Sequence, residues 1–307
     1  MTAPTLLAVP NVSEGRVHAR IEAIAAAFTP AAGASARLLD VHTDADHHRS
    51  VFTLAGNPGQ LADAVLRGAR AAVELIDVMN AAAGGSQPGQ HPHVGALDVA
   101  PIVYYTPERR GAACAEALVL GDRIGHELQV PVFLYGELTA SDAQPARSRA
   151  ELRRGGVAAL AQRIADSHAP LKPDFGPARM HPSAGATLVA ARPPLVAFNL
   201  QLAAPATLHD ARAIAASIRE GGAHGMPGLR AIGVLLDGQV AQVSMNIERP
   251  FHVALAEVVQ AVRAHSEVAS AELVGLAPAA AFDGFPDDVP IPGFDPARHL
   301  IENALGW

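Results

Sequence analysis

The chain has 307 residues, of which 50% are hydrophobic and 17% charged, a composition that excludes global disorder. Its net charge of −7 argues against generic binding to nucleic acid or to anionic membranes, which needs a basic surface. The single cysteine, Cys114, excludes an internal disulfide and the cysteine-rich zinc motifs, and it favours a reducing compartment.

Targeting signals and common nucleotide motifs are missing from the sequence. No apolar window reaches the roughly 18–20 residues of a membrane span, and the N-terminus lacks the features of a secretory signal. Lys172, the only lysine, is followed by proline and cannot serve a phosphate-binding Gly-Lys-Ser/Thr loop. We therefore expect a cytoplasmic protein with neither nucleic acid nor membrane among its partners.

The first half predicts alternating strands and helices. In chain order we expect a strand at 5–10, a helix at 14–28, strands at 34–42 and 50–54, a helix at 60–78, a loop at 81–90, a strand at 97–105, a helix at 114–128, a strand at 131–135 and a helix at 146–165. The helix at 14–28, for example, places Ile21, Ile24 and Phe28 on one face.

The prolines at 170, 173 and 177 indicate a boundary, so we expect domains at 1–177 and 178–307. After them the pattern predicts a strand at 195–202, a helix at 207–220 capped by Thr207, a hairpin of strands 229–236 and 240–247, a helix at 250–265 and a strand at 271–276. This is the strand and helix order of a ferredoxin-like unit, so the fold class is α/β (α+β).

Three polar clusters interrupt the apolar runs. Residues 11–16 lie between a strand and a helix and indicate either a helix cap or an anion site at the helix start. Residues 44–49 lie between two strands, where a solvated turn is the simpler reading. Residues 91–93 (His-Pro-His) precede a buried strand, and imidazoles there are suited to acid–base chemistry.

A metal site is the alternative for these polar residues. Imidazole and carboxylate ligands are present in one stretch of the chain: His42, His47, His48, His91, His93, Asp40, Asp46 and Asp98. No helical His-Glu-x-x-His pattern accompanies them, so we expect no metal and keep a metal-dependent hydrolase as an alternative.

Eight ordered motifs resemble those of the glutamate formiminotransferase (glutamate formimidoyltransferase) family. Residues 9–15 (Val-Pro-Asn-Val-Ser-Glu-Gly) are similar to its opening motif, usually Val-Pro-Asn-Phe-Ser-Glu-Gly. The other similar segments are 46–51, 90–98, 173–177, 181–187, 197–199, 241–246 and 273–276.

The resemblance implies two ferredoxin-like-type subdomains, each a sheet covered by helices, with a substrate tunnel between them. It implies transfer of a formimino group from N-formimino-L-glutamate to tetrahydrofolate during histidine breakdown, without the cyclodeaminase domain fused to the transferase in animals. It also implies an oligomer, here expected to be a homodimer.

The same resemblance implies roles for individual residues. His91 takes the position of the catalytic histidine. The expected donor-binding residues are Asp40, Asp46, His47, Arg49 and His93, with the two aspartates suited to the amidinium and Arg49 to a carboxylate. The expected folate-binding residues are Gly176, Pro177, Arg179, His181, Pro182, Ser183 and Gly185.

Departures from the family pattern gather at the donor end of the site. Gln90 replaces a glutamate, His93 an arginine and His48 an asparagine, and the loop before His91 is longer than usual. Since histidine lacks the arginine fork, a folate-dependent relative with a changed formimino or formyl donor is one alternative. A non-catalytic folate-binding protein is another, although such a protein would not need His91.

Overall fold

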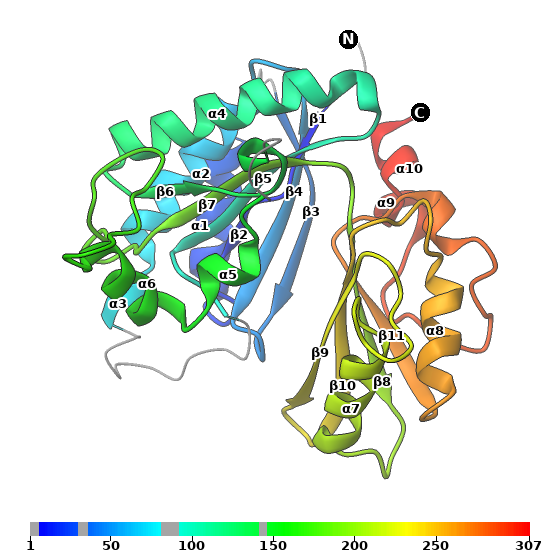
Figure 1. Cartoon of the computed structure of the whole chain (residues 1–307). Helices are drawn as coiled ribbons and strands as arrows, with labels where there is room; N and C mark the ends of the chain where they lie inside the picture. The colour runs from blue at the N-terminus through cyan, green and yellow to red at the C-terminus, as the bar shows by residue number, and fades with distance from the viewer. Residues whose placement is uncertain (1–5, 30–35, 81–91, 141–145) are drawn as a thin grey trace. The chain divides into compact units, whose positions relative to one another are not determined.

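The computed structural model describes residues 6–29, 36–80, 92–140 and 146–307, and the chain divides into two compact units, Met1–Pro193 and Pro194–Trp307 (Figure 1). The boundary expected after Pro177 precedes this division. The reason is a strand that the sequence analysis missed, β7 (Thr187–Arg192), which pairs with strands of unit 1.

Unit 1 contains a ferredoxin-like core. Its elements are β1 (Leu6–Ala8), α1 (His18–Phe28), β3 (Ala36–Asp44), β4 (Arg49–Gly56), α2 (Leu61–Leu75) and β5 (Leu97–Tyr104). β1 pairs antiparallel with both β4 and β5, and β3 pairs with β4, which gives the spatial order β3-β4-β1-β5. The short strand β2 (Asn11–Val12) continues between β4 and β5.

An extension widens this sheet to seven strands in the part of the chain that the structure describes. It comprises α3 (Val78–Asn80), α4 (Arg110–Glu127), β6 (Val132–Leu134), α5 (Arg149–Arg153), α6 (Gly156–Ala165) and β7. β7 lies between β5 and β6 and runs parallel to both. A single helix was expected at 146–165, but Gly155 and Gly156 both have positive φ values, of 76° and 66°, which end one helix and begin the next.

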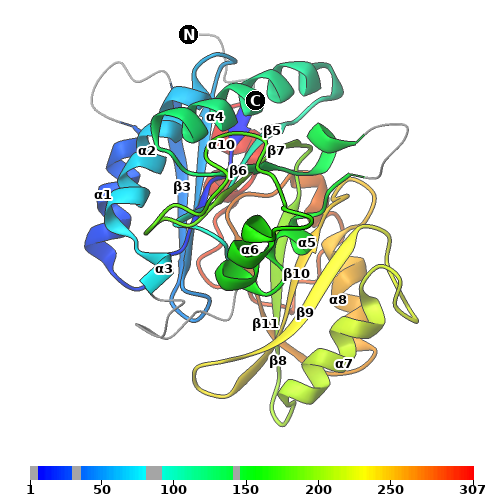
Figure 2. The same ribbon diagram turned by 60° about the vertical axis from the view of Figure 1, so that its left-hand side comes forward.

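The two faces of the unit-1 sheet are covered differently. α1, α2 and α4 pack against one face over a large apolar core that includes Phe28, Phe52 and Ile102. α5 and α6 lie on the opposite side from α1 and α2, as Figure 2 shows, and contribute Leu152 and Leu160 to a second cluster.

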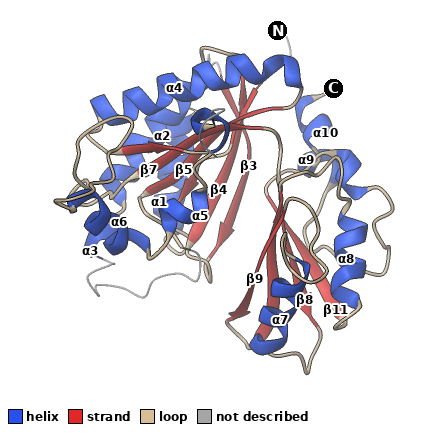
Figure 3. Ribbon diagram, viewed as in Figure 1, coloured by secondary structure: helices blue, strands red, loops and turns tan. Residues whose placement is uncertain are grey.

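Unit 2 is a ferredoxin-like βαββαβ unit, as expected. β8 (Val196–Leu202), α7 (Leu208–Ile218), β9 (Leu229–Leu236), β10 (Val240–Ile247), α8 (Leu255–Arg263) and β11 (Val268–Val274) form an antiparallel sheet in the order β11-β8-β10-β9 with its two helices (Figure 3). α7 and α8 cover one face around a core that includes Phe198 and Val258.

The tail beyond β11 completes unit 2. It carries α9 (Pro296–His299) and α10 (Ile301–Leu305), and the backbone of Ala277 hydrogen-bonds to His299 and Ile301. Phe282 stacks on Phe294 with ring centroids 4.7 Å apart. Among the described helices, none is both long and apolar enough to span a bilayer.

Candidate active site

One face of the unit-1 sheet is polar where β3 pairs with β4. Because cross-strand partners share a face, the register assigns its side chains: Asp40, His42 and Asp44 from β3, and Arg49, Val51 and Thr53 from β4. Phe52 and Leu54 point the other way, into the core beneath α1 and α2. Acidic and basic groups therefore line the face that these two helices leave uncovered.

The turn between β3 and β4 is closed by a histidine–carboxylate pair. Asp44 accepts hydrogen bonds from the backbone N–H of His47 at 2.8 Å and from its ring Nδ1 at 2.5 Å. Burial opposes ionisation, but these hydrogen bonds outweigh it and the pKa of Asp44 lies below its usual value. His47 is only 3% exposed, so its observed contacts organise the turn, and Asp46 beside it is partly exposed.

Glu14 is a buried carboxylate at the start of α1. It accepts hydrogen bonds from the N–H groups of Arg16 at 3.0 Å and Val17 at 3.1 Å, and from the guanidinium of Arg20 at 3.0 Å. Burial raises the pKa of Glu14, but the hydrogen bonds from these three donors together lower it by more, so its pKa lies below the usual value. Glu14 thus satisfies the free N–H groups before a helix that begins at His18, later than the sequence predicts.

His48 joins this segment to the turn. Its Nδ1 accepts a hydrogen bond from the N–H of Gly15 at 3.1 Å, so in the neutral ring Nε2 carries the proton. Burial lowers the pKa of His48, and the positive charges of Arg16 and Arg20 reinforce this against the opposing effect of Glu14. His48 therefore presents a neutral imidazole with an N–H at Nε2.

Arg49, the predicted carboxylate ligand, begins β4 on the polar face. Its Nε atom is buried and has no hydrogen-bond partner among the described residues. Burial lowers the pKa of Arg49 to about 10, which leaves the guanidinium charged at neutral pH. Its Nε donor is therefore available to an anionic ligand, which makes Arg49 a candidate anion-binding residue.

The segment that follows the predicted catalytic histidine is held by Asp98. Its carboxylate accepts a hydrogen bond from the N–H of Val94 at 2.8 Å and pairs with the guanidinium of Arg153. His93, next to Val94, is partly exposed and lies within electrostatic range of His48. His91 and Gln90 lie outside the described residues.

Backbone hydrogen bonds connect three of the polar segments. The N–H of Ser13 donates to Ala96, that of Ala96 to Ala184, and that of Ala186 to Val94, each at 2.9 Å. A Cβ atom on Gly95 would lie 1.8 Å from the carbonyl oxygen of Ala186, so only glycine permits this approach. The segments at 9–15, 92–98 and 181–187 are therefore joined to one another by backbone hydrogen bonds.

The loop that the resemblance assigns to folate is partly joined to this unit. His181 accepts hydrogen bonds at Nδ1 from the N–H groups of Ser183 at 3.3 Å and Ala184 at 3.0 Å, and burial lowers its pKa. Gly185 has a φ of 71°, and a Cβ atom on it would clash with Val94. Pro182 is exposed at the tip of this loop.

Three other predicted folate residues precede that loop in the chain. A Cβ atom on Gly176 would lie 2.7 Å from the carbonyl oxygen of Val130 and 2.9 Å from the Cα of Gly125. This close packing and the φ of 80° explain the glycine without a ligand. Pro177 is partly exposed and Arg179 exposed. Among the described residues, no hydrogen bond joins these three residues to the loop at 181–185.

Unit 2 also has a polar sheet face, which the sequence analysis did not assign. Asn199 donates to Glu272 at 2.7 Å and Gln242 to Ser244 at 2.8 Å, all from strands β8, β10 and β11. Gln242 is fully buried, and its Oε1 has no partner within the described residues. Asparagine and glutamine at alternating positions of otherwise apolar strands were the signal that could have identified this face.

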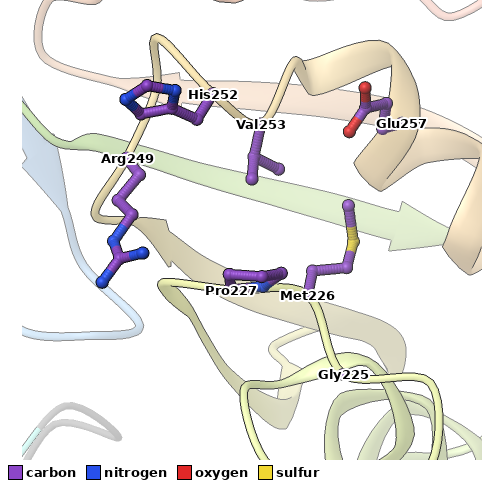
Figure 4. A pocket seen from close by; sticks show the side chains of 7 residues that line it. All are labelled: Gly225, Met226, Pro227, Arg249, His252, Val253 and Glu257. Atoms are coloured by element: carbon purple, nitrogen blue, oxygen red, sulfur yellow. The ribbon is translucent and has the colours of Figure 1, made fainter.

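A separate cavity of about 420 Å³ opens on unit 2 (Figure 4). It is lined by Gly225, Met226, Pro227, Arg249, His252, Val253 and Glu257, and the charged groups of Arg249 and Glu257 lie at opposite ends of it. None of the predicted site residues lines it. In the part of the chain that the structure describes, no three His, Cys, Asp or Glu side chains are placed to hold a metal ion.

Comparison with known proteins finds matches along nearly the whole chain. A model of the formiminotransferase domain, N-terminal subdomain, matches residues 5–192, and a model of the formiminotransferase domain matches residues 197–283. These matches adjoin the division between the two compact units.

Three relatives illustrate the similarity. A glutamate formimidoyltransferase of Streptococcus pyogenes is 33% identical over 97% of both chains, and one of Thermoplasma acidophilum is 33% identical over 88% of this chain and 87% of its own. The formimidoyltransferase-cyclodeaminase of Sus scrofa is 36% identical over 88% of this chain but 49% of its own length. The chain thus spans about half the length of the formimidoyltransferase-cyclodeaminase relatives.

Proposed function

This chain belongs to the formiminotransferase family, and we propose that the polar end of unit 1 carries out its reaction. The reaction transfers the formimino group of N-formimino-L-glutamate to tetrahydrofolate, the co-substrate, and yields 5-formimino-tetrahydrofolate and glutamate. The observation that supports this placement is the backbone connection of the motif segments at 9–15, 92–98 and 181–187. Gly15 of the first segment lies against the backbone of Arg49, whose Nε has no hydrogen-bond partner among the described residues.

The chemistry requires a proton shuttle. N5 of the folate attacks the amidine carbon, which gives a tetrahedral intermediate with three nitrogens. The attacking nitrogen then loses a proton, the departing amine gains one, and the C–N bond to glutamate breaks. One imidazole of near-neutral pKa can perform both transfers, and we assign this role to His91 by its motif.

The donor and the acceptor need different surroundings. Asp40 on the polar face and Asp46 in the turn are the proposed partners of the amidinium cation, and Arg49 of a donor carboxylate. His47 and His93 are proposed to line the donor side. On the acceptor side we retain the loop around His181, Pro182, Ser183 and Gly185, together with Gly176, Pro177 and Arg179, as proposed folate contacts.

Turnover with N-formimino-L-glutamate and tetrahydrofolate tests the proposal. The product is followed by its acid conversion to the methenyl chromophore, with His91→Ala beside the unaltered chain and the exposed His168→Ala as a matched control. We expect activity that falls by about 10²-fold or more only in His91→Ala, the usual contribution of a general acid–base. Equal activity in both variants would remove His91 from the mechanism.

Comparison with a second donor tests whether the departures from the family pattern at positions 48, 90 and 93 change the donor that the protein prefers. Formiminoglycine has one carboxylate where formiminoglutamate has two. A preference for formiminoglycine would favour a changed donor, whereas a preference for formiminoglutamate would make these three residues tolerated variation. We further propose a cytoplasmic location and a homodimer. Light scattering of the purified protein would test the homodimer.

A further inference from the structure

Three arginines of unit 1 gather at one place. Arg49 begins β4, while Arg149 and Arg153 lie one helical turn apart on α5. The positive charges of Arg149 and Arg153 both act on Arg49, and that of Arg149 acts on Arg153. Figures 1 and 2 show α5 on the side of the sheet opposite α1 and α2, which is the polar side.

The carboxylates near this cluster are already engaged. Asp44 holds the backbone and ring of His47, and Asp98 holds Val94 and Arg153. Among the residues that the structure describes, no carboxylate hydrogen-bonds to Arg49 or to Arg149. Two of the three guanidiniums are therefore left without a hydrogen-bonded counter-ion.

Buried donors without partners accumulate at the same place. The Nε atoms of Arg49 and Arg153 are buried and unpaired within the described residues, and so is the hydroxyl of Tyr135. Tyr135 is within electrostatic range of Arg153. A buried donor without a partner costs free energy, and the repulsion between the neighbouring positive charges adds to this cost. An anionic ligand would pair with the donors and reduce the repulsion.

We propose that Arg49 and Arg149 together bind the two carboxylates of the donor, and that Arg153, held by Asp98, positions them. This assignment rests on the proposed function and deepens it, because it selects a dicarboxylate donor over a monocarboxylate one. The planar guanidinium, with its paired donors, matches a carboxylate better than an ammonium would.

Arg149→Gln is the decisive variant, with Arg154→Gln as its matched control. Arg154 is exposed at the end of the same helix and loses the same charge. We expect the KM for formiminoglutamate to rise roughly 10-fold to 100-fold in Arg149→Gln, the loss of a charged hydrogen bond. The KM for tetrahydrofolate should stay unchanged, kcat should change less than about 3-fold, and Arg149→Lys should recover part of the loss.

A purely structural cluster would behave differently. Removal of one charge would relieve repulsion, so Arg149→Gln would raise the Tm and leave both KM values unchanged, and this result would overturn the proposal. The donor preference gives a second readout, since the ratio of kcat/KM for formiminoglutamate to that for formiminoglycine should collapse in Arg149→Gln and persist in Arg154→Gln.

Calorimetry separates failure of this site from failure of the proposed function. If the unaltered chain does not turn over formiminoglutamate, the proposed function fails, and binding of glutarate still tests the two arginines. Glutarate bound by the unaltered chain and by Arg154→Gln, but at least about 10-fold more weakly by Arg149→Gln, supports the site. Equal binding by all three, or binding by none, overturns it.

Discussion

Glu14 is a buried carboxylate whose three hydrogen bonds hold the first polar segment at the start of α1. Its pKa is lowered in the folded protein, so it stabilises the fold above the unfolded-state value near 4.5 and loses that effect as the pH falls through the folded value. The stabilisation is therefore fully present at neutral pH and disappears in acid.

The substitution Glu14→Gln tests this contribution. We expect the free energy of unfolding in urea to fall by about 2–4 kcal/mol at pH 7, and the deficit to shrink as both proteins are taken below about pH 4. Glu22→Gln, an exposed position on α1, is the control and should differ from the unaltered chain by less than about 0.5 kcal/mol. A deficit independent of pH would show that packing, not charge, makes the contribution.

Gly15 is the second residue on which the polar segments depend. A Cβ there would lie 2.1 Å from the carbonyl oxygen of Asp44 and 2.5 Å from the backbone N of Arg49. Gly15→Ala should therefore destabilise the protein by about 2–4 kcal/mol, because backbone atoms cannot move aside cheaply. Gly111→Ala on α4 meets open space and should be neutral or stabilising by up to about 1 kcal/mol. Similar unfolding midpoints for the two variants would contradict the close approach.

At the scale of elements, α2 begins against a carboxylate supplied by α4. Glu116 is 5% exposed and accepts hydrogen bonds from the N–H groups of Gly59 at 2.6 Å and Ala62 at 2.7 Å. These are N–H groups that a helix start leaves without partners, and the negative charge also suits the helix dipole. Two helices that are far apart in sequence are thereby joined by one side chain.

Glu116→Gln should weaken this junction. The amide nitrogen cannot accept a hydrogen bond, so one N–H group loses its partner, and we expect a loss of about 2–3 kcal/mol in the free energy of unfolding. Glu74→Gln, exposed on α2, provides the control. Circular dichroism during urea unfolding measures both, and equal midpoints would show that solvent replaces the carboxylate.

The elements that the sequence predicted were those with a strong local pattern. The apolar run at 97–105 became β5, and Thr207 caps α7 as expected, with Asp210 completing a capping box. β7 was missed because its short apolar run follows a turn-rich motif, and its partners β5 and β6 are distant in sequence. The motifs identified the polar segments, but no local pattern indicated Arg149 and Arg153, whose neighbours come from β4 and β5.

At the scale of the whole molecule, each unit has its own core and its own sheet. The sheet of unit 2 pairs only its own strands among the described residues, and its helices and tail pack on it. We therefore expect a fragment of residues 194–307 to fold alone, with a cooperative urea transition of about 5 kcal/mol or more. Phe198→Ala should lower that value by about 3–5 kcal/mol, and a fragment without a cooperative transition would contradict independent folding.

The backbone bonds that join Ser13, Ala96 and Ala186 to their neighbours have a consequence for how this site opens. Each of these amides donates its hydrogen bond to a segment that is in turn hydrogen-bonded to another of the three segments. No single amide can therefore become exposed to solvent while the other hydrogen bonds remain intact. Their protons should exchange with deuterium in a single concerted event of one free energy. The proposed donor and acceptor sides of the site would then lose their structure together.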